Sequence, residues 1–191
     1  MPTRTPSYRR RSGYTLVELI VVVIMVASMM AIALPRLRIS ASTEVQLAGM
    51  QLAQDLDLAR TRALSARSLA RVTFNTSART YTGYLDDDAD GTISETQVER
   101  DALHGFATRT LPANINYGRG SASAVAGDVA SGTVTFPGAK MNIDSRGLIA
   151  PTTASGTVYL VNQNDPTAVV AVAVSPAGNM RLWTWRDGAW Q

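Results

Sequence analysis

One carboxylate lies inside the most apolar stretch of the chain. Glu18 is followed by residues 19–34, which carry no charge. An acid at the centre of a membrane helix costs about 2.5–3.5 kcal/mol on insertion scales, and less toward the helix ends. No lysine or arginine in the next helical turns supplies a counter-charge. Cleavage between Gly13 and Tyr14 would supply one, because the new amino group is a cation that one subunit could offer to Glu18 of a neighbour.

The apolar segment around Glu18 has the length of a membrane-spanning helix. Residues 14–35 extend about 33 Å at ~1.5 Å per residue, close to a hydrocarbon core of about 30 Å. The first thirteen residues contain four arginines and no acid. This bias predicts a single-pass membrane protein whose N-terminus stays in the cytoplasm and whose chain after Pro35 crosses to the far side, although Arg36 and Arg38 weakly oppose that orientation.

A cleaved secretory signal peptide is the competing interpretation of the same segment. The basic start fits, and residues 31–33 (Ala-Ile-Ala) have the small-x-small pattern that signal peptidase cuts. The product would be a secreted β-rich domain that begins at Leu34. Against this, the apolar stretch exceeds the usual ~7–15 residues of a signal peptide, and Glu18 lies just inside it.

The junction resembles the type IV prepilin family, which includes the pseudopilins of type II secretion. In that family a basic leader ends in glycine, an aromatic residue usually follows, a glutamate is fifth in the mature chain, and a proline is often the twenty-second. Gly13, Tyr14, Glu18 and Pro35 occupy these positions, with tyrosine in place of the commoner phenylalanine. The resemblance implies that a prepilin peptidase removes residues 1–13 and methylates the Tyr14 amine, and that other pilins or pseudopilins are filament partners.

Beyond Pro35 the pattern predicts an amphipathic helix over 36–70. Apolar residues recur there at spacings of three and four, among them Val45, Leu52 and Leu56, with charged and amide side chains on the other faces. Many of the recurring residues are alanines, so a sheet can approach the helix closely. Pro35 would remove one helical hydrogen bond and allow a kink at the boundary.

Residues 71–191 change to short β-branched runs between turn residues, which predicts a β-rich periplasmic domain. The glycine- and serine-rich run 118–132 is expected to be a flexible surface loop. The predicted fold class is α+β, with one long N-terminal helix, half transmembrane and half amphipathic, packed on a mostly antiparallel sheet. The expected strands are 72–74, 81–85, 133–136, 157–161, 169–174 and 180–185.

This second half is similar to the minor subunits of the GspH/FimT/FimU type within the prepilin family. The resemblance rests on three stretches, 84–100, 143–162 and 169–183. It implies a type IV pilin-like fold and a minor subunit of a type II secretion pseudopilus or a type IV pilus. The two machines remain alternatives at this point.

Asp86, Asp88, Asp90 and Gly91 match the start of a calcium loop, D-x-D-x-D-G-x-I. Alternate carboxylates can converge on one hard cation, and glycine permits the sharp turn. The closing position holds Gln97 instead of the bidentate glutamate, so any Ca²⁺ affinity would be weak. An acidic hairpin tip without a metal is the alternative interpretation.

The C-terminus places Trp183, Trp185 and Trp190 among Arg181 and Arg186. Aromatic and arginine side chains together can stack bases and contact phosphates, and some FimT-like relatives take part in DNA uptake. The resemblance therefore gives a DNA-binding minor pilin as an alternative function. Burial of Trp183 and Trp185, which share one strand face, against the helix is the simpler interpretation.

Composition excludes several other classes of function. The 191 residues contain no cysteine, which excludes disulfide frameworks, cysteine zinc sites and thiol catalysis. The single histidine, His104, lacks the spacing of a catalytic triad or a zinc-protease motif, so we expect no enzyme. Four of the 18 basic residues precede Tyr14, which leaves 14 against 15 acidic ones and no bulk attraction to polyanions. A structural filament subunit is the expected function.

Overall fold

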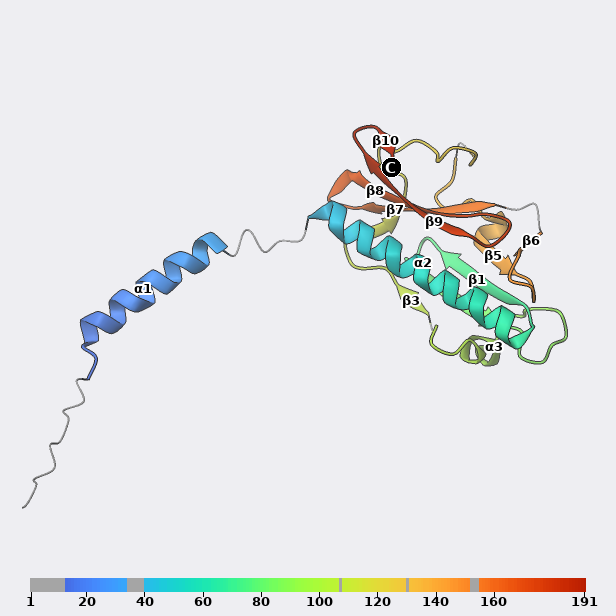
Figure 1. The fold of residues 1–191 in the computed structure, drawn as a ribbon, viewed down its shortest axis with the longest axis horizontal. Helices are drawn as coiled ribbons and strands as arrows, with labels where there is room; N and C mark the ends of the chain where they lie inside the picture. The colour runs from blue at the N-terminus through green and yellow to red at the C-terminus, as the bar shows by residue number, and fades with distance from the viewer. Residues whose placement is uncertain (1–12, 34–39, 107, 130, 152–154) are drawn as a thin grey trace, which may run out of the picture. The chain divides into compact units, whose positions relative to one another are not determined.

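The computed structural model divides the chain into two units, residues 1–39 and 40–191 (Figure 1). The structure describes residues 13–33, 40–106, 108–129, 131–151 and 155–191. The arginines of the leader and Pro35 lie outside these ranges.

The first unit contains helix α1, Leu16–Ala33. Its large apolar side chains from Leu16 to Met30 are all exposed, between 45% at Val21 and 76% at Leu16. The Ser28 hydroxyl donates a hydrogen bond to the Ile24 carbonyl at 2.7 Å, so this polar group is satisfied within the helix itself. No helix in the described part of the chain meets the combined length and hydropathy required to cross a membrane.

The second unit begins with helix α2, Ala41–Ala66, which is shorter than the predicted 36–70. Ser40 is extended, and its hydroxyl accepts the Thr43 N–H at 3.3 Å, so it is the N-cap of the helix. Arg67 adopts the left-handed conformation, with φ 54° and ψ 36°, and ends the helix there. These two local stops set boundaries that the apolar periodicity alone does not reveal.

The described residues form two five-stranded antiparallel sheets, where the sequence predicted one. The first has the order β3-β2-β1-β5-β6, and the second has the order β10-β9-β8-β7-β4. The strands of the first sheet are β1 Ala70–Asn75, β2 Thr80–Leu85, β3 Arg109–Thr110, β5 Lys140–Ile143 and β6 Ile149–Ala150. Those of the second are β4 Ile115–Tyr117, β7 Gly156–Asn162, β8 Asp165–Val174, β9 Met180–Arg186 and β10 Ala189–Trp190.

Helix α2 packs on strands of both sheets (Figure 1), and one of its faces is part of the core. Its buried face includes Val45, Leu52 and Leu56, each fully inaccessible to solvent. At Gly49 an added Cβ would lie 2.6 Å from Val170 Cγ1, closer than real contacts allow. The small residues of this face therefore let the helix approach β8 closely, as the alanine-rich pattern predicted.

One predicted strand, 133–136, is absent as a strand. Only Val134 forms a bridge, to Val158, and the 3₁₀ helix η2, Pro137–Ala139, follows at once. Pro137 has no N–H to donate to a ladder. Phe136 instead enters the core and stacks on Phe74 with a centroid distance of 6.0 Å. The other five predicted strands correspond to β1, β2, β7, β8 and β9, whereas the short strands and helix α3, Gln97–Ala102, were not predicted.

The prediction that Trp183 and Trp185 are buried against the helix is wrong. Leu182 and Thr184 face α2, since a Cβ at Gly49 would lie 2.9 Å from Leu182 Cδ1 and Gln46 Nε2 donates to Thr184 Oγ1 at 3.4 Å. Alternation along β9 therefore places both tryptophans on the opposite face. There Trp183 packs on a second apolar cluster that contains Val125, Tyr159 and Ala171.

The loop 118–132 is anchored across this outer face. The Arg119 guanidinium lies 4.1 Å from the centroid of the Tyr159 ring, and its Nε donates to the Gly132 carbonyl at 2.6 Å. The Tyr159 hydroxyl donates to Asp128 Oδ2 at 2.6 Å and accepts the Val125 N–H at 2.9 Å. The small polar residues of this loop predicted flexibility. Contacts with the buried Tyr159, which is 34 residues from Val125 in the sequence, instead hold the loop in place.

The tyrosine contacts predict a loss of stability at alkaline pH. Burial, reinforced by the hydrogen bond to Asp128, raises the pKa of Tyr159 from 10.0 to about 12. Because the folded pKa is above the unfolded one, the stabilisation is complete below about pH 10 and is lost as the pH rises toward 12. Burial also raises the pKa values of Tyr81 and Tyr117.

We expect the free energy of unfolding of residues 40–191 to fall by about 1 kcal/mol per pH unit for each such tyrosine between pH 10 and 12. Urea titrations followed by tryptophan fluorescence at pH 8, 10 and 11 measure this slope. Tyr159→Phe should be less stable than the wild type at pH 8 but show a shallower decline. Parallel declines in the two proteins would contradict the assignment to Tyr159.

Candidate functional site

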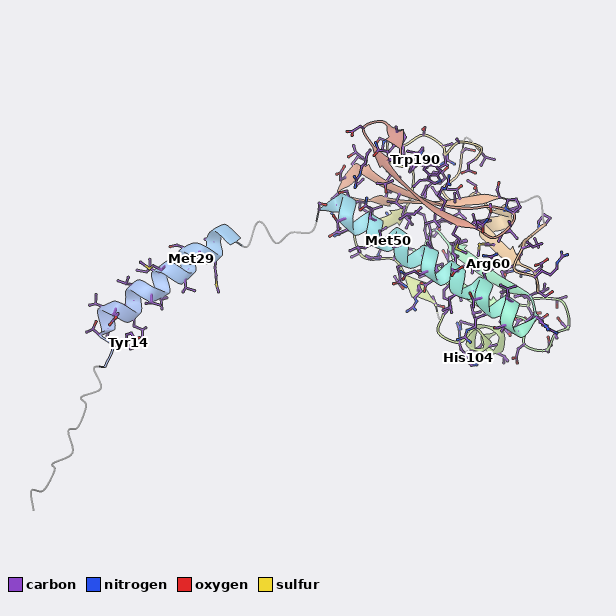
Figure 2. The ribbon with its side chains drawn as sticks, viewed as in Figure 1. Tyr14, Met29, Met50, Arg60, His104 and Trp190 are labelled. Atoms are coloured by element: carbon purple, nitrogen blue, oxygen red, sulfur yellow. The ribbon has the colours of Figure 1, made fainter. Side chains whose placement is uncertain are left out.

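The first candidate site is the start of helix α1, where Gly13 and Tyr14 precede the first helical turn. Both residues are exposed, Tyr14 at 83%, and Figure 2 shows Tyr14 at the N-terminal end of α1. Nothing lies within 4 Å of the position that a Cβ on Gly13 would take. No described residue therefore covers the peptide bond between Gly13 and Tyr14, and the bond is accessible to solvent.

Thr15 caps α1 and places Glu18 in its first turn. The Thr15 hydroxyl accepts the Glu18 N–H at 3.2 Å, and the Thr15 carbonyl accepts the Leu19 N–H at 3.2 Å. Thr15 and Glu18 have the T-x-x-E spacing of a capping box, in which the glutamate side chain bonds back to the cap N–H. That return bond is absent here, so only half of the box forms. Sequence reasoning missed Thr15, although its spacing from Glu18 was the signal.

The Glu18 carboxylate thus has no hydrogen bond or ion pair with any described residue. Its position in the first turn suits an anion, because a helix N-terminus carries partial positive charge. Its neighbours Val17, Leu19 and Ile20 are apolar and exposed. The segment therefore presents one unpaired negative charge within an otherwise apolar surface.

Helix α1 is apolar on every side, which distinguishes it from α2. The exposed apolar residues of α1 fall at almost every position, whereas α2 buries one face and exposes polar residues on the other. A helix that is apolar all round needs apolar surroundings on all sides, either other protein or lipid. Gly13, Tyr14 and Glu18 lie together at the head of this helix, and Pro35 lies outside the described residues.

The second candidate site is the loop between β2 and α3. One carboxylate oxygen from each of Asp86, Asp88 and Asp90 lies within 4.8 Å of the other two. The structure therefore brings the three predicted ligands together. Glu95 and Glu99 are near in sequence but are otherwise engaged, Glu95 with Arg71 and Lys140, and Glu99 with the N-terminus of α3.

The structure does not bring Arg181 and Arg186 together. They occupy the two ends of β9 and are an odd number of positions apart, so they point to opposite faces of the sheet. Arg181 stacks on Trp183 at 5.0 Å from the ring centroid, while Arg186 lines a cavity that also includes Asp165 and Asp187. No shared basic surface results from these two arginines.

A further residue that sequence reasoning missed is Arg60, which ties α2 to two turns. Its Nε donates to the Gly147 carbonyl at 3.0 Å and its Nη2 donates to the Ala177 carbonyl at 3.1 Å. Figure 2 labels Arg60 on α2. At Gly178, where φ is +76°, a Cβ would lie 2.6 Å from the Gly147 carbonyl oxygen. The close approach of these two turns therefore requires glycine at position 178. No local pattern reveals contacts this distant in sequence.

Known proteins resemble this chain both in the sequence around the start of α1 and in the fold. Residues 8–34 match the family described as the prokaryotic N-terminal methylation motif. The fold is similar to that of the minor pseudopilin EpsH from the type II secretion system of Vibrio cholerae, with a TM-score of 0.50 and 14% identity over 77% of this chain and 100% of the other. The type IV minor pilin FimU of Pseudomonas aeruginosa gives a TM-score of 0.47 and 15% identity over 73% of this chain and 87% of the other.

Among curated proteins, no sequence matches the chain. The predicted α+β fold of pilin type, a helix packed on antiparallel sheet, is confirmed by the similarity to EpsH. The chain therefore combines an N-terminal methylation motif with a pilin-type fold.

Proposed function

We propose that this chain, which joins a methylation motif to a pilin-type fold, is a minor pseudopilin or minor pilin, a structural and non-enzymatic subunit of a filament. The observation that carries the proposal is the head of α1, where an accessible Gly13–Tyr14 bond precedes an unpaired Glu18 in a helix that is apolar on all sides. The family match over residues 8–34 includes all three residues.

The first step of the proposed mechanism is proteolysis. A prepilin peptidase hydrolyses the Gly13–Tyr14 peptide bond, which releases the leader with a carboxylate at Gly13 and leaves an ammonium group at Tyr14. The arginines of the leader depart with it. Methylation of the Tyr14 amine retains a basic nitrogen, so the positive charge at the head of the helix persists.

The second step is assembly within the bilayer. Residues 14–35 are long enough to hold the mature subunit in the inner membrane, with the Tyr14 end on the cytoplasmic side, where the leader was removed, and residues 40–191 in the periplasm. When subunits meet, the Tyr14 amine of one faces the Glu18 carboxylate of its neighbour. This pairing offsets the cost of the acid in lipid and sets the axial register between subunits.

The mature N-terminus tests this function directly. We expect mass spectrometry of the protein from its native membrane to find a chain that starts at Tyr14 with one added methyl group. Gly13→Glu should retain all thirteen leader residues, because a charged residue replaces the small one before the cleavage point. A mature chain that starts at Leu34 would mean signal peptidase processing, and it would overturn both the assembly role and the membrane anchor.

A further inference from the structure

The loop that follows β2 holds three acidic side chains without cationic partners. None of Asp86, Asp88 and Asp90 forms an ion pair with a described residue, although one oxygen of each lies within 4.8 Å of the others. The nearby cations are already engaged, since Arg71 and Lys140 both contact Glu95. Three carboxylates at this distance repel one another unless a cation or protons intervene.

Asp86 supplies the second observation, because it is buried and only half satisfied. The residue is 4% exposed. Its Oδ2 accepts the Gly91 N–H at 3.1 Å, whereas its Oδ1 is buried with no hydrogen-bond partner among the described residues. A buried carboxylate oxygen without a partner is costly, and such groups in proteins are usually paired or bound to a metal.

The backbone fixes Asp86 in this position. Its N–H donates to the Leu69 carbonyl at 2.9 Å, and its own carbonyl accepts the Ser68 hydroxyl at 2.6 Å. Asp86 thus remains at the end of the sheet while Asp88 and Asp90, both exposed, come from the loop. Asp88 Oδ1 accepts the Asp90 N–H at 3.3 Å and Asp90 Oδ1 accepts the Thr92 N–H at 2.7 Å, which leaves the second oxygen of each carboxylate available to an ion without unfolding the strand.

We infer that Asp86, Asp88 and Asp90 bind a divalent cation of the Ca²⁺ class. Calcium accepts six to eight oxygen ligands in flexible geometry, whereas magnesium requires a tighter octahedron. In the spacing of a calcium loop, the carbonyl of Thr92 stands at the seventh position, which supplies a main-chain ligand, and water can complete the shell. Affinity is weak, with a dissociation constant on the order of 10⁻⁴ to 10⁻³ M, because Gln97 replaces the bidentate glutamate.

Neither neighbouring glutamate substitutes for that missing ligand. Both oxygens of Glu99 are used, one by the Ser94 N–H at 2.9 Å and the other by the Thr96 N–H at 2.8 Å. Glu95 is held by Arg71, which also donates to the Ile93 carbonyl at 2.9 Å. The part of the loop around Glu95 and Glu99 is therefore held in place without metal. The cation would fix the part from Asp86 to Asp90.

The test measures thermal unfolding of the full chain in a non-ionic detergent, with CaCl₂ against EGTA. At 10 mM Ca²⁺ and a dissociation constant of ~10⁻⁴ M, we expect the melting temperature to rise by roughly 5–10 °C. MgCl₂ at the same concentration should give less than half of this rise. Isothermal titration with CaCl₂ should report one site per chain.

Asp88→Asn and Asp86→Asn are the test variants, and Asp87→Asn is the matched control. Asp87 is adjacent and exposed but lies outside the three-carboxylate cluster. Either test variant should lose at least tenfold in Ca²⁺ affinity, while Asp87→Asn should lose less than threefold. In EGTA, Asp86→Asn should be at least as stable as the wild type, because the buried charge is gone.

Two results would overturn the inference. One is a wild-type melting temperature that changes by less than about 1 °C at 10 mM CaCl₂, which would identify the loop as an acidic turn without a metal. The other is a Ca²⁺ response that Asp88→Asn and Asp87→Asn lower equally, which would indicate general charge screening. Neither result bears on cleavage at Gly13, so the proposed filament function would stand.

Discussion

Glu18→Ala is expected to lower incorporation of the mature subunit into filaments at least tenfold, without lowering its amount in the membrane. The carboxylate has no partner in the described part of its own chain, and in the proposed mechanism its counter-charge comes from a neighbouring subunit. Without the Glu18 carboxylate, the Tyr14 amine of a neighbour would be buried in the apolar assembly as an unpaired charge. Burial of an unpaired charge is strongly destabilising. Quantitative immunoblots of sheared filaments against membrane fractions measure the ratio.

Two further substitutions separate charge from shape at Glu18. Glu18→Gln keeps the size of the side chain but not its charge, and it should fail as Glu18→Ala does. Glu18→Asp keeps the charge and should retain a substantial part of the incorporation. Mass spectrometry should find the mature Tyr14 terminus in all three variants. Normal incorporation of Glu18→Ala with unchanged register would refute the paired-charge mechanism.

Leu56→Ala should lower the free energy of unfolding of residues 40–191 by about 2–5 kcal/mol, a large part of the typical 5–15 kcal/mol. Leu56 is fully buried on the face of α2 that packs on both sheets, and truncation removes apolar contacts and leaves a cavity. Urea titration followed by tryptophan fluorescence measures the change.

Leu47→Ala is the matched control, because it makes the same truncation on the same helix at a side chain that is 55% exposed. It should cost less than about 1 kcal/mol, since most of this side chain is already in water. Equal effects of the two substitutions would mean that α2 does not pack on the sheets through its Leu56 face. The pair therefore tests the orientation of α2 independently of the filament proposal.

Local sequence pattern was sufficient for the features that depend on local forces. The apolar run around Glu18, the Gly13–Tyr14 junction and the three-and-four spacing of α2 are all short-range signals, and the corresponding helices are present. Five of the predicted strands were found for the same reason, because β-branched runs favour an extended backbone. The cap residues Ser40 and Thr15 are local signals of the same kind, because serine and threonine are favoured at helix N-caps.

Long-range packing decided the features that the sequence predicted wrongly. The face of β9 that carries Trp183 depends on which side α2 covers, and Gly49 and Leu182 settle this through a contact between distant segments. The loop 118–132 is composed like a flexible segment, yet its stacking on Tyr159 anchors it. Composition indicates the conformation that a segment prefers in isolation. Contacts with residues distant in sequence determine whether the segment is flexible or held in place in the folded protein.

The sequence by itself determined that a single acid lies at the start of an apolar segment, close to the cleavage site predicted after Gly13, because each of these properties belongs to neighbouring residues. Only the tertiary structure decided that two sheets share one helix, that Asp86, Asp88 and Asp90 come together, and that one oxygen of Asp86 is buried without a partner among the described residues. The physical reason is that convergence and burial depend on the backbone path and on contacts such as that of Asp86 with Leu69. The spacing of residues determines which side chains are able to come into contact. The packing of the folded chain determines which of these contacts form.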